Sequence, residues 1–315
     1  MEKIAENEIV KIATMYYEEG MTQSEIARKR GVSRSLISKI IVEAKRDGIV
    51  EIVINSSSVY TAKLERELEE KYQLKNAIVI DTFNLNKDEI KKIASQQAGL
   101  YLKKIAPRYK KIGLSWGNSL RGLVDSFPYT NHQEATILPL IGGLSDDYFD
   151  IQSNQLSYDL ARKMRAKAKY LYSPALVSNP LIREELSNNN AIQSILEAGK
   201  EVDLALIGIS SLDQESNMRR LGFLSEEDAT ELKGHNAVGV INSRFFNQEG
   251  KEVDSEINKN VIGLNLEELR KIPAIMTVVY GDQKVEAIRA ALESELLNII
   301  VTTDTITEGL LGEEY

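Results

Sequence analysis

Residues 22–50, TQSEIARKRGVSRSLISKIIVEAKRDGIV, contain two short helical patterns separated by a turn. The pattern predicts a first helix over 23–30, with Ile26 and Ala27 facing inward. Gly31 follows Ala27 by four residues and permits the turn. The second pattern has an apolar stripe at helical spacing, made of Leu36, Ile37, Ile40, Ile41 and Ala44. The stretch therefore predicts a helix-turn-helix.

The polar side of this stretch is rich in cations. Residues 22–46 hold seven Lys or Arg residues and only two acidic residues. Ser33 is a suitable N-cap for the second helix, whose first turns are then directed at base edges in a major groove. The predicted DNA-binding residues are Arg28, Arg30, Ser33, Arg34, Ser35, Ser38, Lys39, Lys45 and Arg46. A plain helical hairpin without DNA binding is the structural alternative.

Composition limits the class of protein. A chain of 315 residues is expected to form about two domains, because single cores rarely grow beyond ~250–300 residues. The absence of cysteine excludes disulfides and thiolate metal sites. The first residues, MEKIAENEIVKIA, lack the apolar run of a signal peptide, and no stretch of ~18 apolar residues occurs. We therefore expect a cytoplasmic protein with no membrane partner.

The net charge of −8 is distributed unevenly. Residues 1–54 hold nine cationic and nine acidic residues, whereas the remainder holds 30 of the 39 cationic and 38 of the 47 acidic ones. Affinity for nucleic acid comes from local neutralisation of phosphates, so a basic helix on a neutral domain is sufficient. The acidic remainder is not expected to contact DNA.

The chain is predicted to consist of a helix-turn-helix domain over 1–54, a linker over 55–62 and a larger domain over 63–315. A helix over 8–19 and a strand over 49–54 are expected to complete the first domain. The predicted strands of the larger domain are 77–81, 111–116, 135–141, 169–172, 204–209, 237–242, 274–280 and 299–303. Helical patterns lie between most of them, which predicts a doubly wound, mainly parallel α/β domain.

Glycine turns follow several of these strands. Gly117, Gly142 and Gly281 each stand at or near a strand end, where ligands bind in open α/β sheets. Asn118 and Ser119 begin a helix after Gly117, and a helix N-terminus favours anions. Lys284 is expected in the first turn of a helix, where a bound anion would offset its unfavourable interaction with the helix dipole. A solvated lysine and a glycine needed only for packing are the alternatives.

These features together resemble the SorC/DeoR family of bacterial sugar-responsive transcription regulators. The resemblance covers nearly the whole chain, in matching order and spacing. It is carried by YY (16–17), MTQSEIA (21–27), GVSRSLIS (31–38), IGLSWGNS (112–119), PLIGG (139–143), AVG (237–239), SRFF (243–246) and GDQK (281–284). It implies a sugar-binding domain similar to the sugar-phosphate isomerase and deaminase fold, a homotetramer, and operator binding controlled by a sugar or sugar phosphate.

The resemblance also implies an effector site. The implied residues are Gly117, Asn118, Ser119, Gly142, Gly143, Asn154, Gln155 and Lys284. Ile141 departs from the pattern, because some relatives have Lys or Arg directly before the glycine pair. An isoleucine there cannot form a Schiff base and resembles the sorbitol and sorbose regulators. This favours a hexitol, a ketose or a monophosphate as the ligand.

No cofactor, metal site or catalytic residue is predicted. His132 and His235 lie in polar stretches without evident partners, and no nucleotide-binding glycine motif occurs. The alternative function is a phosphosugar isomerase or deaminase with an appended DNA-binding head. Such an enzyme needs a positioned general base, and Asp304 is the one carboxylate with an arguable position. Trp116 is expected either near the ligand or in the core.

Overall fold

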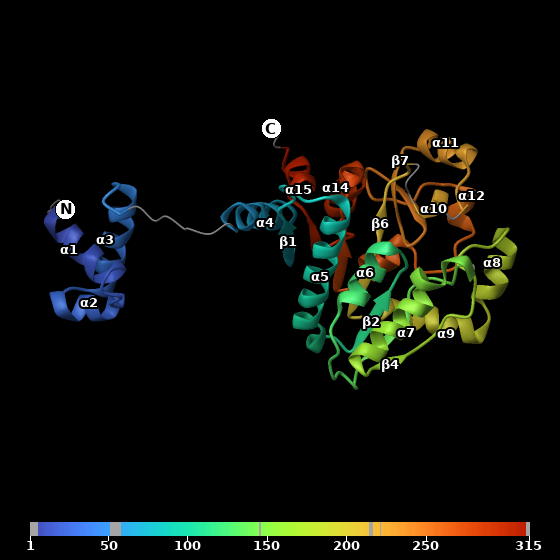
Figure 1. The fold of residues 1–315 in the computed structure, drawn as a ribbon, viewed down its shortest axis with the longest axis horizontal. Helices are drawn as coiled ribbons and strands as arrows, with labels where there is room; N and C mark the ends of the chain where they lie inside the picture. Colours follow the sequence, from blue (N-terminus) through green and yellow to red (C-terminus); the bar gives the residue numbers. More distant parts are fainter. Residues whose placement is uncertain (1–5, 51–57, 145, 214–216, 221, 313–315) are drawn as a thin grey trace. The chain divides into compact units, whose positions relative to one another are not determined.

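The computed structural model describes residues 6–50, 58–144, 146–213, 217–220 and 222–312 (Figure 1). Contacts divide the chain into two compact units, Met1–Val59 and Tyr60–Tyr315. Most of the strand predicted over 49–54 and the first part of the predicted linker lie outside the described residues. Helix α4 begins at Val59, within the segment predicted as linker.

Over residues 6–50, the N-terminal unit contains three helices, α1 (Glu6–Tyr17), α2 (Gln23–Arg30) and α3 (Arg34–Arg46). Thr22 and Glu25 form a capping box at the start of α2, and Gly31 ends α2 in the left-handed conformation (φ 68°). Ser33 caps α3 by accepting a hydrogen bond of 3.2 Å from the amide of Leu36. The core of this unit consists of Ile9, Ile12, Ala13, Ile26, Ala27, Ile37, Ile40, Ile41 and Ala44. The predicted helix-turn-helix is confirmed.

The larger unit is built on a seven-stranded sheet in the order β1-β10-β9-β5-β2-β3-β4. All neighbouring strands of this sheet are parallel. Their bounds are β1 Asn76–Ile80, β2 Lys111–Leu114, β3 Thr136–Pro139, β4 Lys167–Ala168, β5 Leu204–Ile207, β9 Ala274–Val278 and β10 Ile299–Thr303. The nearly continuous apolar runs of these strands are those of a sheet buried on both faces.

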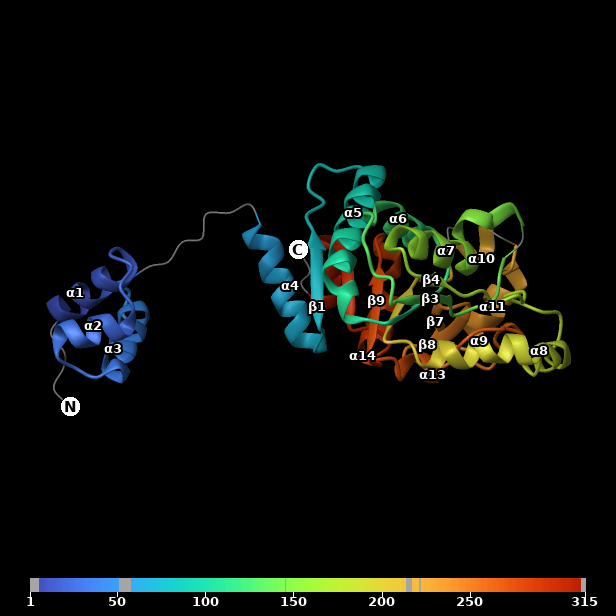
Figure 2. The ribbon, with the colours of Figure 1, turned by 90° about the horizontal axis from the view of Figure 1, so that it is seen from below.

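Helices cover both faces of the sheet, as Figure 2 shows. Helices α5 (Lys87–Ile105), α6 (Asn118–Ser126) and α7 (Ser153–Met164) pack on one face. The opposite face is covered by α4 (Val59–Tyr72), α9 (Asn190–Lys200), α13 (Leu266–Arg270), α14 (Val285–Glu293) and α15 (Asp304–Leu311). On β10, Ile299 and Val301 face the first layer and Ile300 the second. The predicted doubly wound α/β domain is confirmed.

The remaining elements are short. The helices among them are α8 (Pro180–Ser187), α10 (Asn217–Arg220), α11 (Glu226–Gly234) and α12 (Glu256–Lys259). Three 3₁₀ segments are η1 (Ala106–Arg108), η2 (Asp146–Ile151) and η3 (Asp282–Lys284). No helix within the described ranges is both long enough and apolar enough to cross a membrane.

The strand predicted over 237–242 is present, and the strand predicted over 169–172 is not. Ile209 and the segment predicted over 237–242 do not join the parallel sheet but form a separate antiparallel sheet of β6 (Ile209–Ser210), β7 (Ala237–Ile241) and β8 (Arg244–Asn247). Asn242 and Ser243 form the β7–β8 turn with φ of 51° and 59°, the left-handed pair that suits a tight hairpin. The strand predicted over 169–172 is absent, and pairing with β3 instead involves Lys167–Ala168.

Candidate functional site

Most cations of the N-terminal unit lie on its surface. Arg28, Arg34, Lys39, Lys45 and Arg46 are exposed. The Ser35 side chain is also exposed, and its hydroxyl lies 2.9 Å from that of Ser33, whereas Ser38 is half-buried. Arg34 opens α3 directly after the Ser33 cap, so it stands at the end of the helix that a helix-turn-helix directs at base edges.

Arg30, one of the predicted DNA-binding residues, is engaged within the N-terminal unit. Its guanidinium binds the Glu8 carboxylate, with Nε donating to Oε1 at 2.9 Å. This hydrogen bond lowers the pKa of Glu8 and raises the pKa of Arg30. The pair joins α1 to α2, so Arg30 serves the packing of the N-terminal unit. Ser33 likewise acts as the α3 cap.

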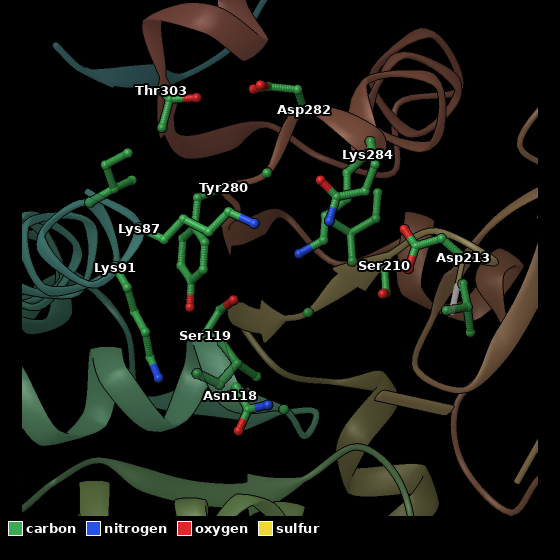
Figure 3. Close-up of a pocket in the computed structure, with 18 of the residues that line it drawn as sticks. Lys87, Lys91, Asn118, Ser119, Ser210, Asp213, Tyr280, Asp282, Lys284 and Thr303 are labelled. Atoms are coloured by element: carbon green, nitrogen blue, oxygen red, sulfur yellow. The ribbon is translucent and has the colours of Figure 1, made fainter. Parts of the chain in front are cut away.

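A cavity of about 580 Å³ lies in the larger unit, at the carboxyl ends of the parallel strands (Figure 3). Its volume is within the ~300–1,000 Å³ typical of small-molecule sites. Charged and polar side chains that line it are Thr82, Lys87, Asp88, Lys91, Ser115, Asn118, Ser119, Ser210, Asp213, Arg220, Asn242, Ser243, Tyr280, Asp282, Gln283, Lys284, Thr303 and Thr305. The predicted Gly117, Asn118, Ser119 and Lys284 are therefore brought together.

The N-terminal ends of four helices contribute to this cavity, because each helix follows a strand of the parallel sheet. Helix α5 is capped by the Asn86 side chain, and α15 is capped by Thr303. In contrast, α6 begins after Gly117, and the η3–α14 segment begins after Gly281, without a side-chain cap on either. The first helical bond of α6 is donated by the amide of Arg121 to Gly117, so the amides of 118–120 precede it. Uncapped helix N-termini attract anions.

Both glycines at these helix starts have a backbone that other residues rarely adopt. Gly117 has φ of 131° and Gly281 has φ of 97°. A Cβ at Gly281 would also lie 2.8 Å from the Gln283 side-chain oxygen. These turns therefore require glycine for conformation, and not only for packing.

Tyr280 and Trp116 contribute aromatic surface to the cavity. Burial raises the pKa of the Tyr280 phenol, although its hydrogen bond with Ser119 opposes that shift. The Lys284 ammonium lies 5.5 Å from the Tyr280 ring centroid. Trp116 Nε1 donates a 2.9 Å hydrogen bond to Ser243 Oγ. The β7–β8 turn thus docks against the end of β2 and forms part of the cavity wall.

Four residues of the implied effector site do not line this cavity. Gly142 packs against backbone, and a Cβ there would lie 2.3 Å from the Pro174 carbonyl oxygen. Gly143 is paired with Pro174 in an isolated bridge. Asn154 Nδ2 donates to the Leu171 carbonyl at 3.0 Å, and Asn154 Oδ1 accepts from the Leu171 amide at 2.9 Å. Gln155 donates to Asp159 at 3.0 Å. These four residues are thus engaged in packing and hydrogen bonds outside the lining of this cavity.

Ile141 also lies away from the cavity. It is completely buried, and it pairs with Gly263 in an isolated bridge. Its side chain therefore belongs to the core beneath the small sheet. Because Ile141 does not line the cavity, it gives no information about the identity of the ligand.

The carboxylates that line the cavity do not include Asp304, the candidate general base of the alternative enzyme function. Asp304 does not line the cavity, and it accepts hydrogen bonds from Thr82 Oγ1 at 2.7 Å and from the Thr305 amide at 2.9 Å. Asp88, Asp213 and Asp282 do line it. Within the described part of the chain, no cluster of His, Asp or Glu side chains could hold a metal ion.

Sequence reasoning missed several cavity residues. Lys87 and Lys91 lie on α5, whose start after β1 the strand-end rule could have indicated. Tyr280 directly precedes the Gly281 turn, so the same rule could have indicated it as a cavity residue. No feature of the sequence indicated Asp213 and Arg220 as cavity residues. They line the cavity because of the way the small antiparallel sheet and the segments beside it pack.

Comparisons with known proteins agree with both units. Residues 57–312 match the family model described as "Putative sugar-binding domain", and residues 11–46 match the model for region 4 of sigma-70. The chain is 31% identical over 305 residues to the sorbitol operon regulator of Klebsiella pneumoniae, covering 96% of this chain and 97% of that protein. It is 27% identical over 304 residues to the deoxyribonucleoside regulator of Bacillus subtilis, covering 96% and 97%.

Solved structures show the same architecture. A DeoR family transcriptional regulator from Listeria monocytogenes has a TM-score of 0.75 and 43% identity, covering 79% of this chain and 99% of that one. The full-length sorbitol operon regulator SorC from Klebsiella pneumoniae has a TM-score of 0.75 and 30% identity, covering 97% and 98%. With a helix-turn-helix and a sugar-binding domain that both match, this chain belongs to the SorC family of sugar-responsive transcriptional regulators.

Proposed function

We propose that the cavity of this regulator binds a phosphorylated sugar, and that occupancy changes the affinity of α3 for operator DNA. The main support is the pair of uncapped helix starts at Gly117 and Gly281, with Lys284 beside them. Amides at a helix N-terminus together with a lysine ammonium form the chemistry that binds a phosphate group. Ser119 and Asn118 add hydrogen-bonding groups.

The DNA-contacting surface is the exposed side of α3 and its surroundings. We assign Arg34, Ser35, Ser38 and Lys39 to the major groove, and Arg28, Lys45 and Arg46 to the backbone phosphates. Arg46 also pairs with Asp47 at 2.9 Å, and Lys45 lies 5.7 Å from the Tyr17 ring centroid. Both cations remain exposed, so DNA phosphates can replace or share these surface contacts. The operator lies in the cytoplasm, which is the proposed place of action.

The protein is proposed to act as a homotetramer. Helix α8 has no buried residue, and Leu181 on it is 74% exposed. Phe83 and Tyr172 are similarly exposed, at 79% and 83%. Exposed apolar side chains indicate association only where they form a contiguous patch, so the proposed assembly rests mainly on the resemblance to the family. Light scattering coupled to size-exclusion chromatography checks this assembly, and a monomer at micromolar concentration contradicts it.

We further propose that the cavity binds without turnover. The relatives are named as regulators, and Asp282 already accepts a 2.7 Å hydrogen bond from Thr305. Assays for isomerisation and deamination of sugar phosphates test this point. Turnover that disappears in Asp213→Asn would establish an enzyme instead.

Calorimetric titration tests the proposed ligand class. Glucitol is compared with glucitol 6-phosphate, and fructose with fructose 6-phosphate, so that each pair differs only in the phosphate. We expect the phosphates to bind more tightly, and Lys284→Ala to reduce that difference. Lys92→Ala is the control, because Lys92 is exposed and does not line the cavity. Equal affinity for sugars and their phosphates would contradict phosphate recognition.

A further inference from the structure

Two lysines on α5 line the ligand cavity. Lys87 and Lys91 are four residues apart, so their side chains lie on the same face of α5. Figure 3 shows Lys87 extending into the cavity toward Lys284, while Lys91 extends from the same helix on the side of Ser119. Neither ammonium has a hydrogen-bond or ion-pair partner among the residues that the structure describes.

Both side chains are exposed, and the helix dipole of α5 does not favour these two cations. Lys87 is the first residue of α5, where the positive end of the helix dipole disfavours a cation. Lys91 places a second positive charge one turn later, and like charges at this spacing repel. Two carboxylates lie between the lysines on α5: Glu89 is engaged in the capping box, where it accepts from the Asn86 amide at 2.9 Å, and Asp88 lines the cavity. An anion bound between α5 and the rest of the cavity would offset both unfavourable interactions.

This anion would be distinct from the phosphate at α6 and α14. The proposed phosphate site uses amides of uncapped helices, whereas the Asn86 side chain occupies the first amides of α5 at 3.0 and 3.1 Å. Helix α5 therefore contributes the ammonium groups of its lysines to the cavity, but no uncapped backbone amides. Such a site suits a second acidic group held at a distance from the first.

The charged side chains that line the cavity include more cations than carboxylates. Its lining contains four cations, Lys87, Lys91, Arg220 and Lys284, and three carboxylates. Two of these carboxylates already accept hydrogen bonds, Asp282 from Thr305 and Asp213 from Ser211. Four helix N-termini add partial positive charge at the same edge of the sheet. The two α5 lysines are thus half of the cations in the lining, and both lie on one helix.

We propose that Lys87 and Lys91 form a second anionic subsite, and that the ligand is a phosphorylated sugar with a further acidic group. This inference rests on the proposed phosphate site and extends it. The second group is a carboxylate, as in a phosphorylated sugar acid, or a second phosphate. The two ammonium groups provide charge-assisted hydrogen bonds to either group.

Calorimetric titrations with two matched pairs of ligands test the subsite. Glucitol 6-phosphate is compared with gluconate 6-phosphate, which adds a carboxylate, and fructose 6-phosphate with fructose 1,6-bisphosphate, which adds a phosphate. In the wild type, at least one doubly acidic ligand should bind about tenfold more tightly than its partner. The pair that shows this gain identifies the second group.

The variants separate this subsite from the phosphate site. In Lys87→Ala/Lys91→Ala the gain from the second acidic group should disappear, while the singly phosphorylated ligand keeps its affinity within about twofold. Lys92→Ala should behave as the wild type, and melting curves verify that each variant is folded. Equal losses for both members of a pair, or no gain in the wild type, would overturn the subsite. If no phosphorylated ligand binds the wild type, the proposed phosphate site fails instead.

Discussion

The Thr305 hydroxyl donates a 2.7 Å hydrogen bond to the Asp282 carboxylate and thereby joins the first turn of α15 to the turn that carries Lys284. The two residues follow neighbouring parallel strands, β10 and β9. Thr303 Oγ1 lies 3.1 Å from Thr305 Oγ1 and extends the network to the α15 cap. This network ties the glycine-dependent turn at Gly281 to the start of α15.

Thr305→Val should weaken phosphate binding by loosening that turn. The substitution keeps the shape of the side chain but removes the donor to Asp282. We expect a loss of affinity of about three- to tenfold for a sugar phosphate, equivalent to a hydrogen bond of roughly 0.5–1.5 kcal/mol. Calorimetric titration measures it. Thr307→Val is the matched control, because Thr307 does not line the cavity and its hydroxyl donates at 2.8 Å to the Thr303 carbonyl within the same helix start, not to Asp282. An equal loss in both variants would refute the positioning role.

Gly117→Ala should abolish phosphate binding through conformation. A Cβ is disfavoured at φ of 131°, so the turn must distort and the amides at the start of α6 lose their alignment. We expect about 1–3 kcal/mol of strain, seen as a lower melting temperature, together with loss of sugar-phosphate binding. Gly312→Ala is the control, with φ of 83° and open space around the new Cβ. It should lose stability but retain binding, and retained binding in Gly117→Ala would contradict the site.

Arg34→Ala should weaken specific operator binding by about 1–3 kcal/mol, the range for one base contact. Binding to unrelated duplex DNA should change much less, because base contacts carry the specificity. Fluorescence anisotropy with both duplexes at several salt concentrations measures the difference. The control is Lys11→Ala, an exposed cation on α1. If both variants lose the same affinity for both duplexes, α3 does not read bases through Arg34.

The Glu8–Arg30 pair should make the stability of the N-terminal unit depend on acidity. Its hydrogen bond holds the folded pKa of Glu8 below the usual value of 4.5. The unfolded chain therefore binds the proton more readily, so this contribution is present above about pH 4.5 and is lost as the pH falls through the folded pKa. Glu8→Gln should melt lower than the wild type at pH 7, with a difference that shrinks below pH 4. A constant difference across that range would contradict the assignment.

Local signals explain why the N-terminal unit could be predicted closely. Thr22, Gly31 and Ser33 act on residues within a few positions of themselves, so their capping roles are visible in the sequence. The spacing of Ile37, Ile40 and Ala44 then determines which face of α3 is buried. The role of Arg30 was not visible, because its partner Glu8 is on another helix.

The sequence by itself determined the helix-turn-helix, the parallel α/β domain and the glycine turns at Gly117 and Gly281, since apolar periodicity and backbone chemistry are local properties. Only the tertiary structure decided that Gly142, Asn154 and Gln155 serve packing, that Ile141 is buried beneath the small sheet, and that Lys87 faces Lys284 across a cavity. These outcomes depend on which strands become neighbours. The long-range packing that sets strand order brings separate segments to one edge of the sheet, and no short stretch of sequence encodes it.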